Sequence, residues 1–309
     1  MISIYKSNNG KLELMNQPVL GSWINVVDPT PLEIDQLTAM GLPMDYVTYP
    51  LDLDELARTE RENGERLIVL RIPCYTGESS DIPYQTMPLG IILTSELIVT
   101  VSKVRTEIIE DFLNGRIREV ATGKVNRFVL RILLRTAEKF LSYLHQINHK
   151  VEEIEDKLQR STKNKELMEL LKYQKSLTLF MTALKSNLVM MERLHRSQIF
   201  HKYPEDEDLL EDVLTENQQA IQMTDIAANI LSAMMDAFAS IISNNLNDVM
   251  KILASITIVV SLPTIIFSFY GMNVDLPFDT HSLAFMIILL MSIALVGVAG
   301  WFFVRRDWL

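Results

Sequence analysis

Four hydroxyl side chains, those of Thr257, Ser261, Thr264 and Ser268, recur at intervals of four, three and four residues near the C-terminus. This spacing places them on one face of an α-helix. A single hydroxyl in a membrane helix usually bonds its own backbone or tightens helix packing. The aligned row favours a different chemistry, because Ile, Val, Leu and Phe occupy the other faces and uncharged oxygen ligands suit a water-filled path for a hard cation. Two helices cannot enclose such a path, so several copies of the segment must surround it.

The row lies in the first of two long apolar segments. Residues 252–270 run for 19 positions without a charge, and residues 282–304 run for 23. A helix that crosses about 30 Å of hydrocarbon needs about 20 residues, and helices of soluble proteins rarely stay apolar on every face for so long. We predict a transmembrane helical hairpin whose first helix lines the path. The second helix has no comparable row, so we expect it to face lipid.

Charged residues are unevenly distributed along the chain, which has a net charge of −10. Most of them precede residue 252, and few follow Lys251. An acidic surface argues against nucleic acid as a partner. Lys251, Arg305 and Arg306 flank the apolar segments, whereas the loop between the segments carries Asp275 and Asp279 and no Lys or Arg. Positive residues favour the cytoplasmic side. We therefore expect a multi-pass protein of the cell membrane with both termini in the cytoplasm.

The preceding 251 residues show two different sequence patterns. Residues 1–120 contain apolar, β-branched runs bounded by Gly, Pro and Ser, such as ERLIVLRIP and LIVTVS, which predict strands. Thr30 as a cap, Pro31 in the first turn and Gly41 as a stop predict a short helix among them. From about Lys124, apolar residues recur every three or four positions and predict a long amphipathic helix. STKNKE breaks this helix, and a second long helix returns antiparallel to it.

A third long helix is expected from Pro204 into the first apolar segment, because no Gly or Pro interrupts the chain before Pro263. The predicted organisation is an αβα domain at 1–120, a helix pair at 121–203, a stalk at 204–251, a first transmembrane helix at 252–270, an external loop at 271–281, a second transmembrane helix at 282–304 and a basic tail at 305–309.

No motif for catalysis accompanies these elements. The chain has no Gly-rich phosphate loop, no His-Glu metal motif and no Gly-x-Ser-x-Gly nucleophile motif. His145 and His149 are four residues apart on a predicted helix, and we interpret them as surface or interface histidines. The single cysteine, Cys74, excludes an internal disulfide and fits a reducing compartment. We expect no enzyme, although a membrane-anchored enzyme is a remote alternative; a structural scaffold would leave the hydroxyl row unexplained.

The sequence YGMN, directly after the first apolar segment, resembles the signature of the CorA magnesium transporter family. The long helix that runs into it and the terminal RRDWL, which is similar to the basic-then-Trp-Leu ending of that family, support the resemblance. It implies an α+β cytoplasmic domain with αβα layers, a long helical stalk and two C-terminal transmembrane helices. It also implies a homopentamer in the lipid bilayer, with five first helices around the pore.

The resemblance implies three sets of site residues. The selectivity filter consists of Gly271, Met272 and Asn273. Asn247, Met250, Leu253 and Thr264 match pore-lining positions of the family, and Thr257, Ser261 and Ser268 of the hydroxyl row complete the predicted pore lining. Asp212 matches an aspartate that binds regulatory magnesium between subunits, and Glu216 shares its helix face. The partner acid from the N-terminal domain has no motif that places it.

The implied function is uptake of magnesium, with cobalt and nickel as further candidate substrates, through a channel that cytoplasmic magnesium closes. Magnesium prefers oxygen ligands and releases its water reluctantly, so amide and backbone carbonyls at the filter can hold its hydration shell. The alternative is a zinc transporter of the same fold, in which the loop typically reads Gly-Val-Asn. Met272 favours magnesium, and so does the lack of His or Cys along the predicted pore.

Overall fold

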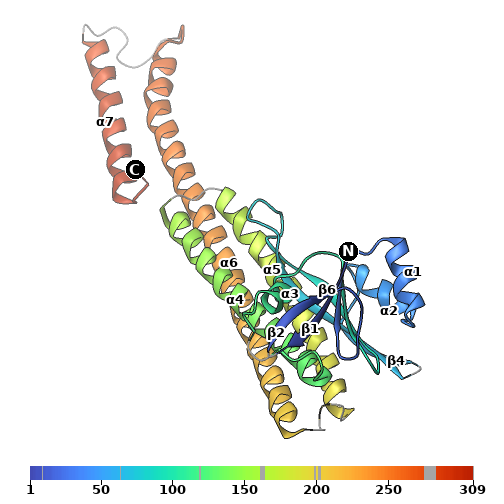
Figure 1. Ribbon diagram of the computed structural model, residues 1–309. Coiled ribbons are helices and arrows are strands. Elements are labelled where there is room, and N and C mark those ends of the chain that lie inside the picture. Colours follow the sequence, from blue (N-terminus) through green and yellow to red (C-terminus); the bar gives the residue numbers. More distant parts are fainter. Residues whose placement is uncertain are drawn as a thin grey trace. The chain divides into compact units, whose positions relative to one another are not determined.

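The computed structural model describes residues 1–8, 10–62, 64–117, 120–160, 164–197, 200, 203–274 and 283–308. The chain divides into two compact units, Met1–Met235 and Asp236–Leu309. The first unit contains all seven strands and most of the helices of the described residues (Figure 1). The second contains the C-terminal part of one long helix and the last helix.

The first unit is built on a mixed seven-stranded sheet in the order β2-β1-β3-β7-β6-β5-β4. The strands are β1 (Ile2–Asn8), β2 (Lys11–Met15), β3 (Trp23–Val27), β4 (Arg58–Glu62), β5 (Glu65–Tyr75), β6 (Tyr84–Leu93) and β7 (Ile98–Ser102). The central pair β3 and β7 is parallel, and the other pairs are antiparallel. Every residue of β7 is buried, because helices cover both faces of the sheet. The strands predicted from the apolar runs are confirmed.

One face of the sheet is covered by α1 (Pro31–Ala39), α2 (Met44–Thr48) and the short 3-10 helix η1 (Tyr49–Leu51). The predicted start of α1 is confirmed, since the Thr30 side chain accepts a hydrogen bond from the Glu33 N–H and the Glu33 carboxylate accepts one from the Thr30 N–H, a capping box. Gly41 follows the helix with a φ of 95°, which an L-residue with a side chain rarely adopts. Leu37 and Tyr46 bury their side chains against this face.

The opposite face is covered by α3 (Glu107–Leu113), α4 (Val125–Arg160), α5 (Asn164–Arg196) and the first turns of α6 (Pro204–Tyr270). The rings of Trp23, Phe112 and Phe128 pack together at its centre, with 5.1 Å between the centroids of Trp23 and Phe128. The αβα layering and the two long helices after Lys124 are therefore confirmed. The sequence did not predict α2, β4 or α3.

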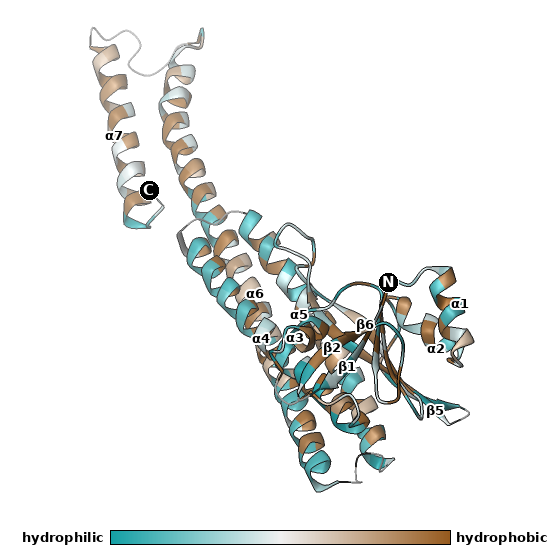
Figure 2. Ribbon diagram, viewed as in Figure 1, coloured by the Kyte–Doolittle hydropathy of each residue, from teal (hydrophilic) through white to brown (hydrophobic). Residues whose placement is uncertain are grey.

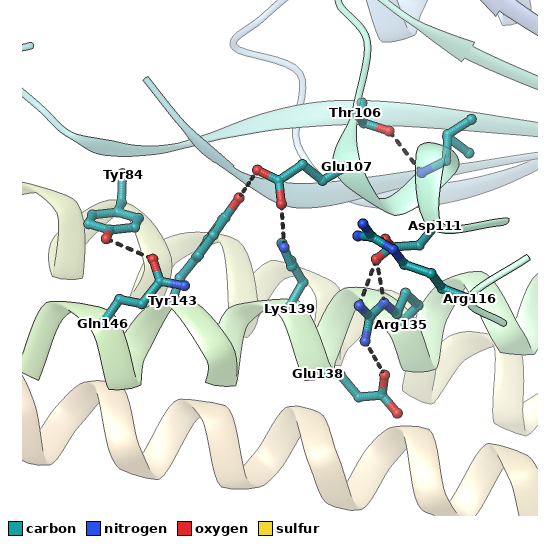
Figure 3. Close-up of polar contacts among 11 residues, drawn as sticks. Tyr84, Thr106, Glu107, Asp111, Arg116, Arg135, Glu138, Lys139, Tyr143 and Gln146 are labelled. Atoms are coloured by element: carbon teal, nitrogen blue, oxygen red, sulfur yellow. Dashed lines mark hydrogen bonds and ion pairs between the residues drawn. The ribbon is translucent and has the colours of Figure 1, made fainter. Parts of the chain in front are cut away.

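A polar network joins α3 to α4 (Figure 3). The buried Asp111 carboxylate accepts two hydrogen bonds from Arg135, at 2.9 and 2.6 Å, and one from Arg116 at 2.9 Å. Burial alone would raise the pKa of Asp111, but these bonds outweigh it and hold the pKa below its usual range. One turn away, Glu107 pairs with Lys139 and accepts the Tyr143 hydroxyl at 2.8 Å. These contacts fix α3 on the surface of α4.

Helix α5 also bonds the sheet where β4 has ended. Register places Val69 of β5 opposite Arg58, the first residue of β4, so Arg71 has no partner on that side. The Asn187 side chain takes this place, because its amide oxygen accepts the Arg71 N–H at 2.9 Å and its amide nitrogen donates to the Arg71 carbonyl at 2.8 Å. The Asn187 amide thus satisfies the backbone N–H and C=O of Arg71, as a residue of an adjacent strand would.

The second unit contains the C-terminal part of α6 and α7 (Ala284–Arg305). Both helices are long and apolar enough to span a membrane, and Figure 2 shows the hydrophobic residues along α7 and the end of α6. Helix α6 continues through Pro263 to Tyr270 without a break. The expected long third helix is confirmed.

Candidate ion pathway and regulatory residues

Three hydroxyls of the row on α6 donate hydrogen bonds to the backbone of their own helix. Thr257 Oγ1 donates to the Leu253 carbonyl at 2.7 Å, and Ser261 Oγ donates to the Thr257 carbonyl at 2.7 Å. Thr264 Oγ1 donates to the Val260 carbonyl at 3.1 Å. This is the backbone bonding expected of single hydroxyls, but it has a chemical consequence for the row. Each of these three hydroxyls has used its only proton, so its oxygen can only accept a hydrogen bond from, or ligate, whatever approaches it.

All four residues of the row are exposed in the single chain. A groove of about 560 Å³ follows this face near the end of α6. Its lining consists of Val260, Ser261, Thr264, Ile265, Ser268, Phe269 and Met272. The structure therefore places the hydroxyls of Ser261, Thr264 and Ser268 and the predicted filter residue Met272 on one surface.

The predicted filter begins where α6 ends. The Gly271 N–H donates to the Phe267 carbonyl at 2.9 Å, and the Met272 N–H donates to the Phe269 carbonyl at 3.3 Å. A Cβ at position 271 would lie 3.2 Å from the Phe267 carbonyl oxygen, so glycine allows this tight exit from the helix. Gly271, Met272 and Asn273 are exposed. Their carbonyl and amide groups are thus available to a ligand, while Asp275 and Asp279 lie outside the described residues.

Toward the N-terminus of α6, the remaining predicted pore residues are also exposed. Met250 is 55% exposed and Leu253 is 56% exposed, and Asn247 is in the same class. By contrast, Ser255 is fully buried outside the row, where its hydroxyl donates to the Lys251 carbonyl at 2.8 Å. The exposed residues therefore need a covering that the single chain does not supply.

Asp212 is exposed on α6, and Glu216 is half-buried one turn later. Among the residues that the structure describes, no three His, Cys, Asp or Glu side chains gather in a way that could hold a metal ion. The described part of the single chain thus does not complete a metal site at Asp212. His145 and His149 are exposed, and His149 Nε2 lies 3.8 Å from Glu153, which confirms their interpretation as surface residues.

The acids that begin α6 have a partner that sequence reasoning missed. The Arg127 guanidinium near the start of α4 donates to the buried Asp206 carboxylate at 2.9 Å and to Glu205 at 2.5 Å. The hydrogen bond with Asp206, followed by that with Glu205, raises the pKa of Arg127. Glu205 and Asp206 therefore hold the starts of α4 and α6 together. This structural role distinguishes them from Asp212, which is exposed.

Comparisons with known proteins identify relatives of this chain. The family described as CorA-like Mg²⁺ transporter protein matches residues 21–306. The cobalt/magnesium transport protein CorA of Methanocaldococcus jannaschii is 26% identical over 298 residues, which cover 93% of this chain and 91% of that protein.

Solved structures share the fold. The complete CorA magnesium transporter from M. jannaschii matches with a TM-score of 0.86 at 23% identity, over 100% of this chain and 99% of that one. The ZntB cytoplasmic domain from Vibrio parahaemolyticus matches with a TM-score of 0.61 at 11% identity, over 78% of this chain and 98% of that one. Because the family match spans nearly the whole sequence, this chain belongs to the family of CorA-like Mg²⁺ transporter proteins.

Proposed function

We propose that this protein transports divalent cations across a membrane, with magnesium as its main substrate and cobalt as a further one. The observation that carries the proposal is the set of three acceptor-only oxygens on α6, those of Thr257, Ser261 and Thr264, in the helix that ends directly before Gly271. Family membership and the M. jannaschii relative, named as a cobalt/magnesium transport protein, support it. The protein is a transporter and not an enzyme.

The proposed filter binds magnesium through its water. Mg²⁺ dehydrates reluctantly, so the Asn273 amide and the Gly271 carbonyl hydrogen-bond to the hydration shell. Contacts of this kind are weak enough for the ion to leave, whereas full carboxylate coordination would hold it too tightly. The hydroxyl row then accepts hydrogen bonds from the same water along the helix.

The transporting form is a homopentamer in which five α6 helices line the pore and five α7 helices face lipid. Support comes from apolar side chains of α6 that the single chain leaves exposed, such as Ile230 at 56%, Leu246 at 61% and Val249 at 60%. In the first unit, an apolar groove of about 410 Å³ between α4, α5 and α6 contains Ile226 and Ile230. Surfaces of this kind favour association with further copies.

The domain scheme predicted from the sequence completes this proposal. Residues 1–251 and 305–309 lie in the cytoplasm, residues 252–270 and 282–304 cross the cell membrane, and residues 271–281 face outside. Positive residues at both inner flanks support this orientation.

The proposed regulation acts at Asp212, with Glu216 on the same helix face. A carboxylate from a neighbouring subunit would complete the site, since the described part of the single chain contains no three-ligand group. Carboxylates that face each other repel unless a cation neutralises them. Bound magnesium therefore stabilises a closed arrangement, and low cytoplasmic magnesium opens the pore.

The test is magnesium uptake into vesicles that contain the reconstituted protein. Asn273→Ala should reduce uptake to background, because it removes the side-chain carbonyl that binds the hydration shell. Val274→Ala is the matched control, since the neighbouring Val274 is exposed but offers no side-chain oxygen. The oligomer size of each variant is measured first. Normal uptake by an Asn273→Ala protein of native size would contradict the proposed filter, and faster uptake of zinc than of magnesium would contradict the proposed substrate.

A further inference from the structure

Backbone hydrogen bonds fold the end of α7 into a defined turn. The Trp308 N–H donates to the Phe303 carbonyl at 3.0 Å, and the Asp307 N–H donates to the Val304 carbonyl at 3.2 Å. These are the two bonds of a Schellman motif, in which the residue after the cap has a positive φ. Asp307 has a φ of 55°. The Trp308 ring stacks on the Phe303 ring with 5.8 Å between centroids, so the chain returns Trp308 to the side of the helix.

Two arginines lie at this turn, each beside an aromatic ring. The Arg305 guanidinium carbon is 5.1 Å from the centre of the Trp301 ring, and that of Arg306 is 5.6 Å from the Phe302 ring. Both arginines are exposed. Within the described residues, no carboxylate lies in ion-pair distance of either guanidinium. Each guanidinium therefore lies beside a ring, and its N–H donors have no carboxylate partner among the described residues.

The turn lies where an apolar helix meets its first charges. Helix α7 has no charged residue before Arg305, so the turn marks the boundary between hydrocarbon and headgroups when α7 spans a membrane. Lys251 is the other base of this unit, but it pairs with Asp248 at 2.9 Å. The described part of the unit carries three bases and three acids, but the two bases without an ion pair, Arg305 and Arg306, are both at the end of α7, where the helix dipole also favours cations.

We propose that Arg305 and Arg306, flanked by Trp301 and Trp308, form a binding site for the phosphate groups of anionic phospholipids. The planar guanidinium donates two parallel hydrogen bonds to phosphate oxygens, and the tryptophan rings occupy the interface beside it. An anionic lipid is preferred over a zwitterionic one because choline cancels the phosphate charge. Each arginine should contribute about fivefold to this preference. The proposal requires α7 to span a membrane, with this end at the cytoplasmic face, but it does not depend on which ion the protein transports.

The test measures which lipid lies beside the turn. The full-length protein is reconstituted in vesicles of mixed phosphatidylglycerol and phosphatidylcholine, and one of the two lipids carries brominated acyl chains that quench tryptophan. Trp301 and Trp308 report on the turn, whereas the third tryptophan, Trp23, is fully buried in the first unit. A Trp301→Phe/Trp308→Phe variant gives the contribution of Trp23, which is subtracted.

Brominated phosphatidylglycerol should quench the wild type more strongly than its share of the vesicle lipid predicts. The Arg305→Gln/Arg306→Gln variant should lose this enrichment. Asp307→Asn should increase it, because Asn also accepts a positive φ and the change removes the carboxylate of the turn. Lys251→Gln is the control, since this charge is already paired, and should leave the enrichment unchanged.

Equal quenching by the two lipids in the wild type would overturn the proposal. So would enrichment that persists in the Arg305→Gln/Arg306→Gln variant. Displacement of the brominated lipid by millimolar inorganic phosphate would assign the site to free phosphate, and would also overturn it. Quenching does not require ion movement, so parallel uptake measurements separate a failure of this site from a failure of the proposed transport.

Discussion

Substitution of the buried Asp111 tests how firmly α3 is held on α4. Asp111→Asn keeps the shape of the side chain but removes the charge that binds Arg135 and Arg116. The side chain of Asp111 is 2% exposed, that of Arg135 is 26% exposed and that of Arg116 is 70% exposed. The contact with Arg116 is therefore largely screened by solvent and contributes little.

The expected loss comes mainly from the two bonds that Arg135 donates. Charge-assisted hydrogen bonds contribute about 1.5–3 kcal/mol each, and removal of one partner from a buried ion pair costs about 3–5 kcal/mol. Because Arg135 also pairs with Glu138 at 2.9 Å, we expect a loss near the lower limit, about 3 kcal/mol. For a unit of this size, that corresponds to a decrease in Tm of about 6–12 °C.

The assay is thermal unfolding of the full-length protein in detergent, followed by circular dichroism at a constant magnesium concentration, since bound ligand shifts the apparent stability. Arg116→Gln is the matched control and should change the free energy of unfolding by less than about 1 kcal/mol. A Tm of Asp111→Asn equal to that of Arg116→Gln would refute the reasoning.

The pH dependence gives a second check. The pKa of Asp111 is lower in the folded protein than its ordinary value of 3.8. The stabilisation is therefore fully present above the ordinary value, and it is lost only as the pH falls through the folded-state pKa. The difference between the wild type and Asp111→Asn should be constant between about pH 6 and 8. A difference that changes in this range would show that another group titrates with the network.

Three further predictions concern the pore face, the regulatory residue and the sheet. A cysteine at Thr264 should react with a water-soluble thiol reagent, and a cysteine at Val259, on the opposite side of α6, should not. The native Cys74 adds little background because burial raises its thiol pKa to about 11. Equal labelling at positions 264 and 259 would contradict the pore assignment. The stalk of Asp212→Lys should resist protease without magnesium, whereas the wild type should need magnesium, and wild-type cleavage that ignores magnesium would contradict the regulatory site. Asn187→Ala should lower the free energy of unfolding by about 2–3 kcal/mol, measured by thermal unfolding, because it leaves a β5 N–H and C=O unpaired; a loss below about 1 kcal/mol would show that water replaces the amide.

Several elements could be predicted because their signals are local. The capping residue Thr30 and Gly41 bound α1 by chemistry that acts within one turn. The long apolar period from Lys124 onward predicted α4 because it repeats over many turns. The sequence did not predict α3, since seven residues are too few to show a period. It also did not predict β4, an edge strand whose sequence RTERE has no apolar residue.

The candidate site shows the same division. The helix face that carries Thr257, Ser261 and Thr264 follows from spacing alone, and the structure adds the hydrogen bonds that leave their oxygens as acceptors. The turn that places Trp308 on Phe303 had no predicted counterpart, because a positive φ at a residue other than glycine is a weak signal in a sequence.

The sequence by itself determined the properties of single helices: the two apolar spans, the hydroxyl face, and the exit from α6 at Gly271. These depend only on the helical period and on neighbouring residues. Tertiary structure alone decided which distant charges meet. Asp206 pairs with Arg127, and Asp111 pairs with Arg135. The pair with Arg127 gives the first acids of α6 a structural role that differs from the regulatory role proposed for Asp212. A charge has no preferred partner until folding sets its distance from every other charge and removes the water between them.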